Sequence, residues 1–267
     1  MRVFSATALS VFLALPAGAE TFDCVINPAV TVRVGAPVPG LLAEVYVDQG
    51  DLVEAGQEIA RLRSEIEATT LDVLTLQAES RAEIEAQESR LKLANQQLER
   101  VRQMIDRNIA TREELEAAEA ETEVIARELL IAEMRRKVAG LELERARRQV
   151  EQRVITSPVE GIVVARHLFS GEYLDTDSPV VTVARIDPLH VEAFLPVAYH
   201  GTITKGMVLQ VMPDAPIGGS YGAKVEVVDR VFDAASGTFG IRLRLDNPDL
   251  ALPAGHRCRI ELAPPGQ

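Results

Sequence analysis

Two cysteines are the residues of this sequence whose type and placement predict a covalent bond. Cys24 and Cys258 are the chain's only cysteines, and they stand near its opposite ends. In an oxidising compartment two lone thiols are more often paired than free, so we expect a disulfide between the N-terminal segment and the C-terminal domain. Closing so long a loop stabilises a fold by roughly 4 to 5 kcal/mol in the chain-entropy model. The alternative is two buried free thiols.

Other polar residues lack the spacing of a catalytic or metal site. The histidines are scattered through the second half of the chain, at His167, His190, His200 and His256. Ser170-Gly171 and Ser236-Gly237 are typical of turns, because neither lies in a G-x-S-x-G context. Gly218-Gly219 precedes strand-like sequence instead of a helix, so it is not a phosphate-binding loop. The sequence therefore predicts no enzyme, no cofactor and no metal centre.

Composition narrows the class of partner. The 267 residues are 47% hydrophobic and 25% charged, which is typical of a folded protein and excludes a disordered chain. Aromatic residues are only 4%, tryptophan is absent and the net charge is −12. An acidic chain with few aromatic residues does not suit the phosphate backbone of a nucleic acid.

The first nineteen residues have the pattern of a cleaved signal peptide. Arg2 precedes a mostly apolar stretch from Val3 to Leu15, and Ala17 to Ala19 has the small-x-small pattern of a cleavage site. We expect the mature chain to begin at Glu20 in the periplasm. Retention as a membrane anchor is the alternative, although the apolar stretch is shorter than the roughly 20 residues of a typical spanning helix.

Helix-forming sequence begins abruptly at residue 63. Glycine and proline are absent from Arg63 to Ala139, where Glu, Ala, Arg, Gln and Leu dominate. Ser64 and Glu67 have the spacing of a capping box. We expect the first helix to run from about 65 to 107.

A second helix should follow a short turn. Thr111 and Glu114 repeat the capping-box spacing, and Asn108 before them tolerates the left-handed conformation that ends a helix. We expect the second helix at about 112–152, antiparallel to the first. Both helices carry seven-residue repeats in two registers. Those of the first helix are Ile84, Leu91, Leu98 and Ile105, with Val73, Ala94 and Val101 as the companion register. Those of the second are Leu115, Leu129, Leu143 and Val150, with Ala118, Ile125, Ala132, Ala139 and Ala146 as the companion register. These repeats predict a two-stranded coiled-coil hairpin.

Strand-like sequence with glycine and proline turns flanks the hairpin on both sides. The two flanks have the same style, so we expect the hairpin to interrupt a single β unit. A further stretch from 189 to 262 alternates apolar and polar residues and is typical of a small barrel or sandwich.

The flanks resemble the halves of a biotinyl/lipoyl domain. The first half matches over Gly40–Leu62, GLLAEVYVDQGDLVEAGQEIARL, and the second over Thr156–Val163 and Gly171–Leu174. Half-motif, hairpin and half-motif is the order found in the periplasmic adaptor proteins, or membrane fusion proteins, of bacterial efflux pumps. Asp246–Asp249 and Leu252–Gly255 resemble the closing strands of their barrel domain.

This resemblance implies an elongated, multidomain α+β fold in which a split lipoyl-like β-sandwich is interrupted by the α-hairpin and followed by a small β-barrel. The expected segments are a signal peptide (1–19), an extended N-terminal segment (20–39), lipoyl-like half 1 (40–63), the coiled-coil hairpin (64–153), lipoyl-like half 2 (154–186) and the β-barrel domain (187–267).

The resemblance also implies partners. Such adaptors form a ring, a hexamer in this family, that joins an inner-membrane transporter to an outer-membrane channel of the TolC type. Family members contact the channel through an Arg, a Leu and a Ser at the hairpin tip, and the matching positions here are Arg100, Met104 and Thr111. Met keeps an apolar side chain and Thr keeps a hydroxyl. Each residue also has a purely structural interpretation, as a solvated charge, a neighbour of the seam and a helix cap.

The class of transporter follows less directly. Typical members continue past the barrel into a membrane-proximal domain, whereas this sequence ends at Gln267. We expect docking through the barrel, a partner adaptor or another subunit. A resistance-nodulation-division pump is the first expectation and an ABC transporter the second.

Two other functions compete with the adaptor. A lipoate or biotin carrier would need a lysine where Ile66 stands, and the first lysine of the chain is Lys92, inside the helix. A periplasmic scaffold unrelated to transport would also use a coiled coil, but it would not need the flanking β halves.

Overall fold

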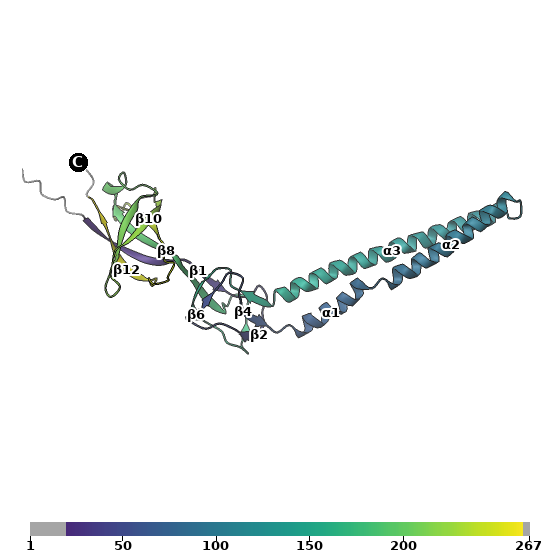
Figure 1. Ribbon diagram of the computed structural model, residues 1–267, viewed down its shortest axis with the longest axis horizontal. Coiled ribbons are helices and arrows are strands. Elements are labelled where there is room, and N and C mark those ends of the chain that lie inside the picture. The colour runs from purple at the N-terminus through teal and green to yellow at the C-terminus, as the bar shows by residue number, and fades with distance from the viewer. Residues whose placement is uncertain (1–19, 264–267) are drawn as a thin grey trace, which may run out of the picture.

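The computed structural model describes residues 20–263, so the expected signal peptide at 1–19 lies outside the described residues. A β-barrel occupies one end of the elongated molecule, a β-sandwich the middle and a helical hairpin the other end (Figure 1). The elements in chain order are β1 (Glu20–Val34), β2 (Gly40–Val45), β3 (Leu52–Val53), β4 (Glu58–Leu62), α1 (Glu65–Glu79), α2 (Ala82–Asp106), α3 (Arg112–Glu151), β5 (Val154–Thr156), β6 (Gly161–Arg166), β7 (Tyr173–Leu174), β8 (Val181–Pro196), the 3-10 turn η1 (Val197–Tyr199), β9 (Val208–Pro213), β10 (Tyr221–Val228), β11 (Thr238–Leu245) and β12 (His256–Leu262).

Six antiparallel strands close the barrel. Their order is β1-β12-β9-β10-β11-β8, and a further pairing between β8 and β1 completes the ring. Alternate side chains of a strand point to the same face, so each strand sends every second residue into the core. Leu195, Phe239 and Leu243 are fully buried there. The expected small barrel is therefore confirmed.

Two long strands pass through both β domains. β1 pairs with β12 and β8 in the barrel and then, after a register shift between Pro28 and Val30, with the sandwich part of β8. The barrel thus includes a strand from the segment expected to lie outside it, and the expected boundary at residues 186 and 187 falls inside β8. Apolar alternation indicates which face of a strand is buried but not which strand pairs with it.

The sandwich is assembled from both sides of the hairpin. One of its sheets has the order β5-β4-β2-β7, which interleaves strands that precede and follow the helices. Ile59 and Leu62 share a core with Ile155 and Val163. The expected β unit interrupted by a hairpin is confirmed.

The hairpin contains three helices instead of two. α1 and α2 both pack against α3, and the expected continuous helix at 65–107 is wrong at Ser80, which is extended with φ −63° and ψ 128°. Serine favours caps and turns because its hydroxyl competes for backbone groups. The Nε of Arg136 on α3 donates to the carbonyl of Ala78, 3.3 Å away, next to this break.

The expected helix starts are right, but only one expected cap forms. α1 begins at Glu65, yet Ser64 makes no capping hydrogen bond, and Glu67 pairs instead with Arg153. At α3 the capping box is confirmed: Thr111 N donates to Glu114 Oε2 at 2.7 Å, and Glu114 N donates to Thr111 Oγ1 at 3.3 Å.

Among residues 20–263, no helix combines the length and hydropathy that a membrane span requires.

Candidate functional site: the tip of the hairpin

The tip is a short turn fixed by local hydrogen bonds. Asn108 has φ 58°, the left-handed conformation that the sequence indicated, and this reverses the chain after α2. The amide of Ile109 donates to the carbonyl of Met104 at 2.8 Å, and the Thr111 capping box starts α3. Ile109 remains 70% exposed. The turn therefore presents an apolar side chain on a well-defined backbone.

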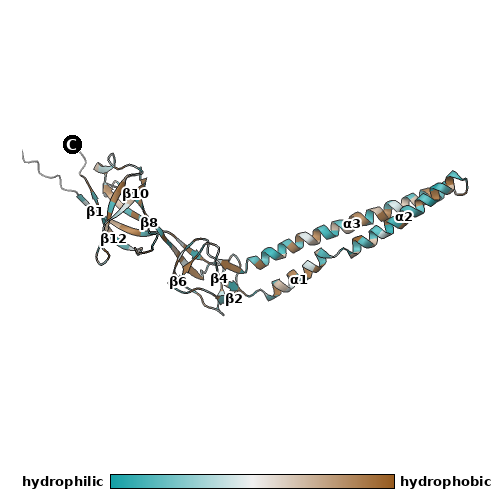
Figure 2. Ribbon diagram, viewed as in Figure 1, coloured by the Kyte–Doolittle hydropathy of each residue, from teal (hydrophilic) through white to brown (hydrophobic). Residues whose placement is uncertain are grey.

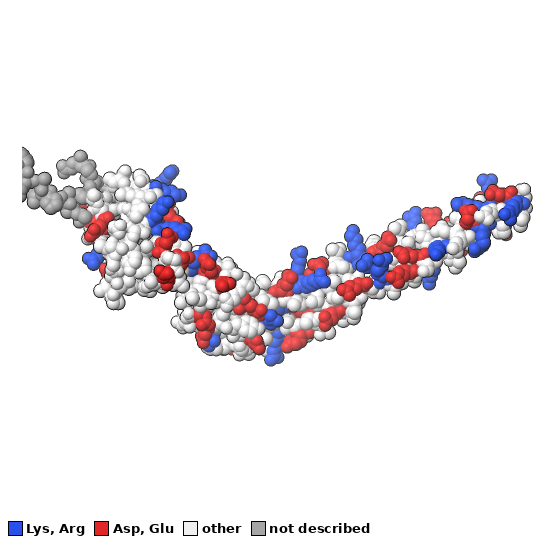
Figure 3. Space-filling model, in the orientation of Figure 1, with Lys and Arg blue, Asp and Glu red and all other residues white. Residues whose placement is uncertain are grey.

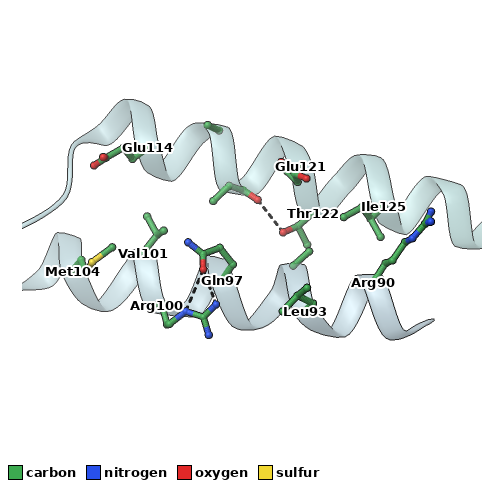
Figure 4. Close-up of a pocket in the computed structure, with 13 residues that line it drawn as sticks. Arg90, Leu93, Gln97, Arg100, Val101, Met104, Glu114, Glu121, Thr122 and Ile125 are labelled. Carbon is green, nitrogen blue, oxygen red and sulfur yellow. Dashed lines mark hydrogen bonds between the residues drawn. The ribbon is translucent and has the colours of Figure 1, made fainter. Parts of the chain in front are cut away.

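Behind the tip, α2 and α3 enclose a groove with a volume of about 780 Å³ (Figure 4). Small and apolar side chains dominate its floor, which is lined by Leu93, Ala94, Val101, Ala117, Ala118, Thr122 and Ile125. Figure 4 shows Val101 and Gln97 pointing from α2 toward α3, and Ile125 lying between the two helices. The seam residues of the tip are thus partly accessible from one side.

Opposite charges line the two walls of the groove. Arg90 and Arg100 belong to α2, and Glu114 and Glu121 belong to α3. Arg100 donates through Nη2 to Gln97 Oε1 at 2.6 Å, which holds its guanidinium along its own helix. A helix laid in this groove would therefore meet positive charge on one side and negative charge on the other.

The structure brings two of the three expected contact residues together. Arg100 and Met104 both line the groove, and Met104 is 37% exposed. Thr111 lies across the turn, where its hydroxyl accepts the capping bond from Glu114. Its backbone role is thus established by geometry, while contact of all three with a channel remains a prediction.

Sequence reasoning missed the rest of the groove. Leu93, Ala117 and Glu121 line it but belong to neither heptad register of the seam. The available signal was an apolar or small residue directly beside a seam position, as Leu93 stands beside Ala94 and Ala117 beside Ala118. Such a residue widens the apolar surface of a two-helix pair to one side.

The groove is an open surface between two helices, lined by apolar, amide and charged side chains. Within residues 20–263, no group of three or more His, Cys, Asp or Glu side chains is placed to hold a metal ion. The expected pairing of Cys24 with Cys258 is confirmed by a disulfide in the barrel. Its role there is structural.

A barrel and a sandwich that share two long strands, with a helical hairpin inserted in the sandwich, define a barrel-sandwich hybrid protein of the membrane fusion class. Residues 30–185 match the family model described as CzcB-like, barrel-sandwich hybrid domain. The chain belongs to this family of periplasmic adaptors, and the resemblance inferred from the half-motifs is confirmed.

Named relatives agree with this assignment. The chain is 31% identical over 186 residues to the pyoverdine export membrane fusion protein PvdR of Pseudomonas putida, covering 68% of this chain and 47% of that protein. It is 25% identical over 240 residues to the multidrug resistance protein MdtA of Escherichia coli, covering 85% and 54%. The chain thus spans about half the length of these relatives.

Solved structures share the fold at low identity. The crystal structure of MacA from Actinobacillus actinomycetemcomitans has a TM-score of 0.78 at 20% identity, covering 92% of this chain and 78% of that one. The membrane fusion protein Spr0693 from Streptococcus pneumoniae has a TM-score of 0.63 at 15% identity, covering 92% and 100%. At this level of identity the likeness concerns the fold alone.

Proposed function

We propose that this protein is a periplasmic adaptor that links an inner-membrane efflux transporter to an outer-membrane channel of the TolC type, as part of a sealed export conduit. The observation that carries the proposal is the hairpin, whose turn lies at the far end of the molecule from the barrel (Figure 1). A connector needs separate contact surfaces at its two ends, and the relative PvdR is a membrane fusion protein by name.

The hairpin acts in this proposal as a stiff coiled-coil arm. α3 is a single helix of 40 residues, and side chains at seam positions of both partners are buried: Ile84, Leu98 and Val101 from α2, and Ala132, Leu143 and Ala146 from α3. Burial of apolar side chains along one line resists splaying of the helices. Copies of the arm would stand side by side in a ring, a hexamer in the resembled family.

The tip is the proposed channel contact, through Arg100, Met104 and Thr111 together with the exposed Ile109. Arg100 and Met104 contribute a charge and an apolar side chain to the lining of the groove, while Thr111 fixes the start of α3. Tip residues that join an apolar contact to a guanidinium suit a protein partner, because arginine and methionine are enriched at protein interfaces.

The decisive test places a photo-crosslinking residue at Ile109 in living cells. Ile109 is exposed and, unlike Thr111, has no side-chain role in a helix cap. We expect illumination to capture an outer-membrane channel protein, and the same probe at the exposed Asn95, on the side of α2, serves as the control. Capture of a soluble protein at Ile109, or of nothing during active export, would favour the scaffold function over the adaptor.

The transporter is sought with a second probe on the barrel. Val231 is 85% exposed in the loop between β10 and β11, at the end of the molecule away from the hairpin. We propose a resistance-nodulation-division transporter as the captured partner, and capture of an ABC transporter would replace that class without affecting the adaptor role.

A further inference from the structure

Both outer edges of the hairpin expose large apolar side chains. On α1, Ile66 is 81% exposed and Leu76 is 73% exposed. On α3, Leu141 is 65% exposed and Met134 is 59% exposed. Single exposed apolar residues are ordinary, but apolar residues repeated along a helix face indicate a surface that another surface covers.

These side chains lie on opposite edges of the hairpin. In α1 the half-buried residues Leu71, Leu74 and Ala78 face α3. Val73, which the heptad pattern placed in the seam, and Leu76 lie about half a helical turn away from that face and point outward. In α3 the buried residues Leu143 and Ala146 face α1. By the same spacing Val138 and Leu141 point away from α1. We call these two outward stripes the α1 edge and the α3 edge.

The charges beside the two edges have opposite sign. α1 contains no lysine or arginine, and its acidic side chains Glu65, Asp72 and Glu79 border the α1 edge. Basic side chains border the α3 edge at the same end of the hairpin, namely Lys137, Arg145 and Arg148. Figure 3 shows basic side chains standing along the α3 edge near the sandwich and acidic ones along the α1 helix below it.

These six charged side chains form no ion pair within the described residues, although other charges on the same helices do. Glu144, the acidic residue nearest to Arg145 in sequence, pairs with Arg147 at 2.7 Å. The α3 edge therefore keeps its net positive charge, and the α1 edge its negative charge.

The complementary features lie at matching heights along the hairpin. Two ion pairs serve as anchors. Glu67 on α1 pairs with Arg153 near the sandwich, and Glu83 on α2, just beyond the break at Ser80, pairs with Arg135 on α3. Counting helix rise from these two anchors puts Asp72 within about one turn of Arg145 in height. By the same count Glu79 lies within about one turn of Lys137, and Leu76 within about one turn of Leu141.

We propose that the α1 edge of one copy docks on the α3 edge of a second copy of this chain, side by side and with both tips pointing the same way. Apolar contact between Leu76 and Leu141 would provide attraction, and the flanking charges would set the height and direction of the pairing. Because the two edges differ, the contact is heterologous and repeats from copy to copy. This inference rests on the proposed adaptor function and identifies the surfaces on which its ring would form.

The first experiment introduces Leu76→Cys and Leu141→Cys into the full chain, whose own two cysteines are already paired. Mild oxidation is expected to give a ladder of disulfide-linked multimers on a non-reducing gel. Each single variant is the control, because a heterologous contact does not bring two copies of the same position together. The proposal would be overturned if the double variant gave no ladder, or if Leu76→Cys formed a crosslink to a different protein in cells.

The second experiment tests the charges in the same cysteine background. Asp72→Arg or Arg145→Asp alone is expected to lower the ladder yield at least about tenfold, and the two together are expected to restore it. Circular dichroism checks that each variant keeps its helices, which is expected because both positions are exposed. A ladder that resists either single reversal, or that the double reversal does not restore, contradicts the pairing.

The two levels of the proposal fail in different ways. If the edges are wrong, the probe at Ile109 still captures the channel while the ladder is missing. If the adaptor function is wrong, that probe captures no channel while the ladder still forms.

Discussion

Cys24 and Cys258 stand directly opposite each other on the antiparallel strands β1 and β12, with their Cα atoms 4.8 Å apart and their sulfur atoms bonded. Both residues belong to the apolar core of the barrel. The bond spans 234 residues of sequence and ties the first strand of the described chain to its last. Since β1 continues into the sandwich, the disulfide also secures the strand that connects the two β domains.

Loss of the disulfide should destabilise the barrel. In the chain-entropy model a loop of this length contributes roughly 4 to 5 kcal/mol, so the double variant Cys24→Ala with Cys258→Ala should lose up to about that much free energy of unfolding. Hydrogen exchange of the β1 and β12 amides measures the effect, with α3 as the internal reference. Reductant should accelerate exchange in the native chain and leave the double variant unchanged. Equal protection of β1 in both proteins would contradict this prediction.

A charge in the helical seam should separate the hairpin from the β domains. Leu98 on α2 is only 7% exposed, and an unpaired carboxylate at that position costs several kcal/mol. We expect Leu98→Asp to lose much of its helical circular dichroism and all adaptor activity while the barrel and sandwich stay folded. The matched control is Asn95→Asp, at an exposed position less than one turn away. Unchanged efflux in Leu98→Asp would show that the seam is dispensable.

The Thr111 cap gives a prediction that separates its structural role from partner contact. Replacing a threonine N-cap by alanine costs typically about 1 kcal/mol, whereas serine keeps the hydroxyl. Thr111→Ala should therefore lower the stability of the hairpin by about that amount, and Thr111→Ser should not. Thermal unfolding followed by circular dichroism checks both variants. A Thr111→Ser variant as unstable as Thr111→Ala would mean that the methyl group, not the capping hydroxyl, matters.

The hairpin was predictable because its signals are local. Thr111, Glu114 and Asn108 determine the turn within seven residues of sequence, and the structure bears out all three. Ser64 had the same local signal but makes no capping hydrogen bond, and the Glu67 carboxylate, which would complete the box, pairs with Arg153 just after α3. The competing partner is 86 residues away in sequence, so no local pattern could indicate it.

The break at Ser80 and the sharing of β1 between two domains were not predictable for a similar reason. The break falls at Ser80, and the contact seen beside it, from Arg136 to the carbonyl of Ala78, comes from a residue 58 positions away in sequence. β1 reads as one strand, but its partners β12 and β8 come from distant parts of the chain. The groove beside Arg100 and Met104 likewise needs the two helices to be placed side by side.

Asn247 should be one of the most sensitive polar positions in the barrel. It is 4% exposed, and its amide nitrogen donates to the carbonyls of Ile186 and Leu252 at 2.9 and 3.0 Å, while its oxygen accepts from the Leu252 amide at 3.0 Å. Asn247→Ala leaves these backbone groups without partners, at a cost of about 1 to 3 kcal/mol for each that stays buried. Denaturant unfolding is the measurement.

The neighbouring Asp246 provides the control for Asn247. Its side chain is 74% exposed and pairs with Arg244 at 2.9 Å, and such surface pairs contribute little. Asp246→Ala should therefore leave the unfolding midpoint nearly unchanged. A similar loss in both variants would attribute the effect to the loop as a whole instead of the buried amide.

Alkaline pH should weaken the barrel through Tyr199. Burial of the ring, then the hydrogen bond to Glu20 and the charge of that carboxylate, raise the pKa of Tyr199 to about 12; the hydroxyl donates to Glu20 Oε2 at 2.7 Å. An unfolded tyrosine has a pKa near 10, so the folded state holds this proton more tightly. The stability from this group is fully present below about pH 10 and is lost as the pH rises toward 12.

Comparison with Tyr199→Phe isolates that contribution. The phenylalanine variant keeps the ring that packs edge-on against Phe22, with centroids 5.1 Å apart, but has no proton to lose. It should be less stable than the native chain at pH 8. The difference should shrink between pH 10 and 12, because in that range ionisation of Tyr199 stabilises the unfolded state of the native chain, and the variant has no such group. Tyr46, whose pKa is raised by partial burial and by Glu44, titrates in both proteins and cancels in the comparison. A stability difference that stays constant up to pH 12 would mean that the Tyr199 hydroxyl ionises as readily in the folded barrel as in the unfolded chain.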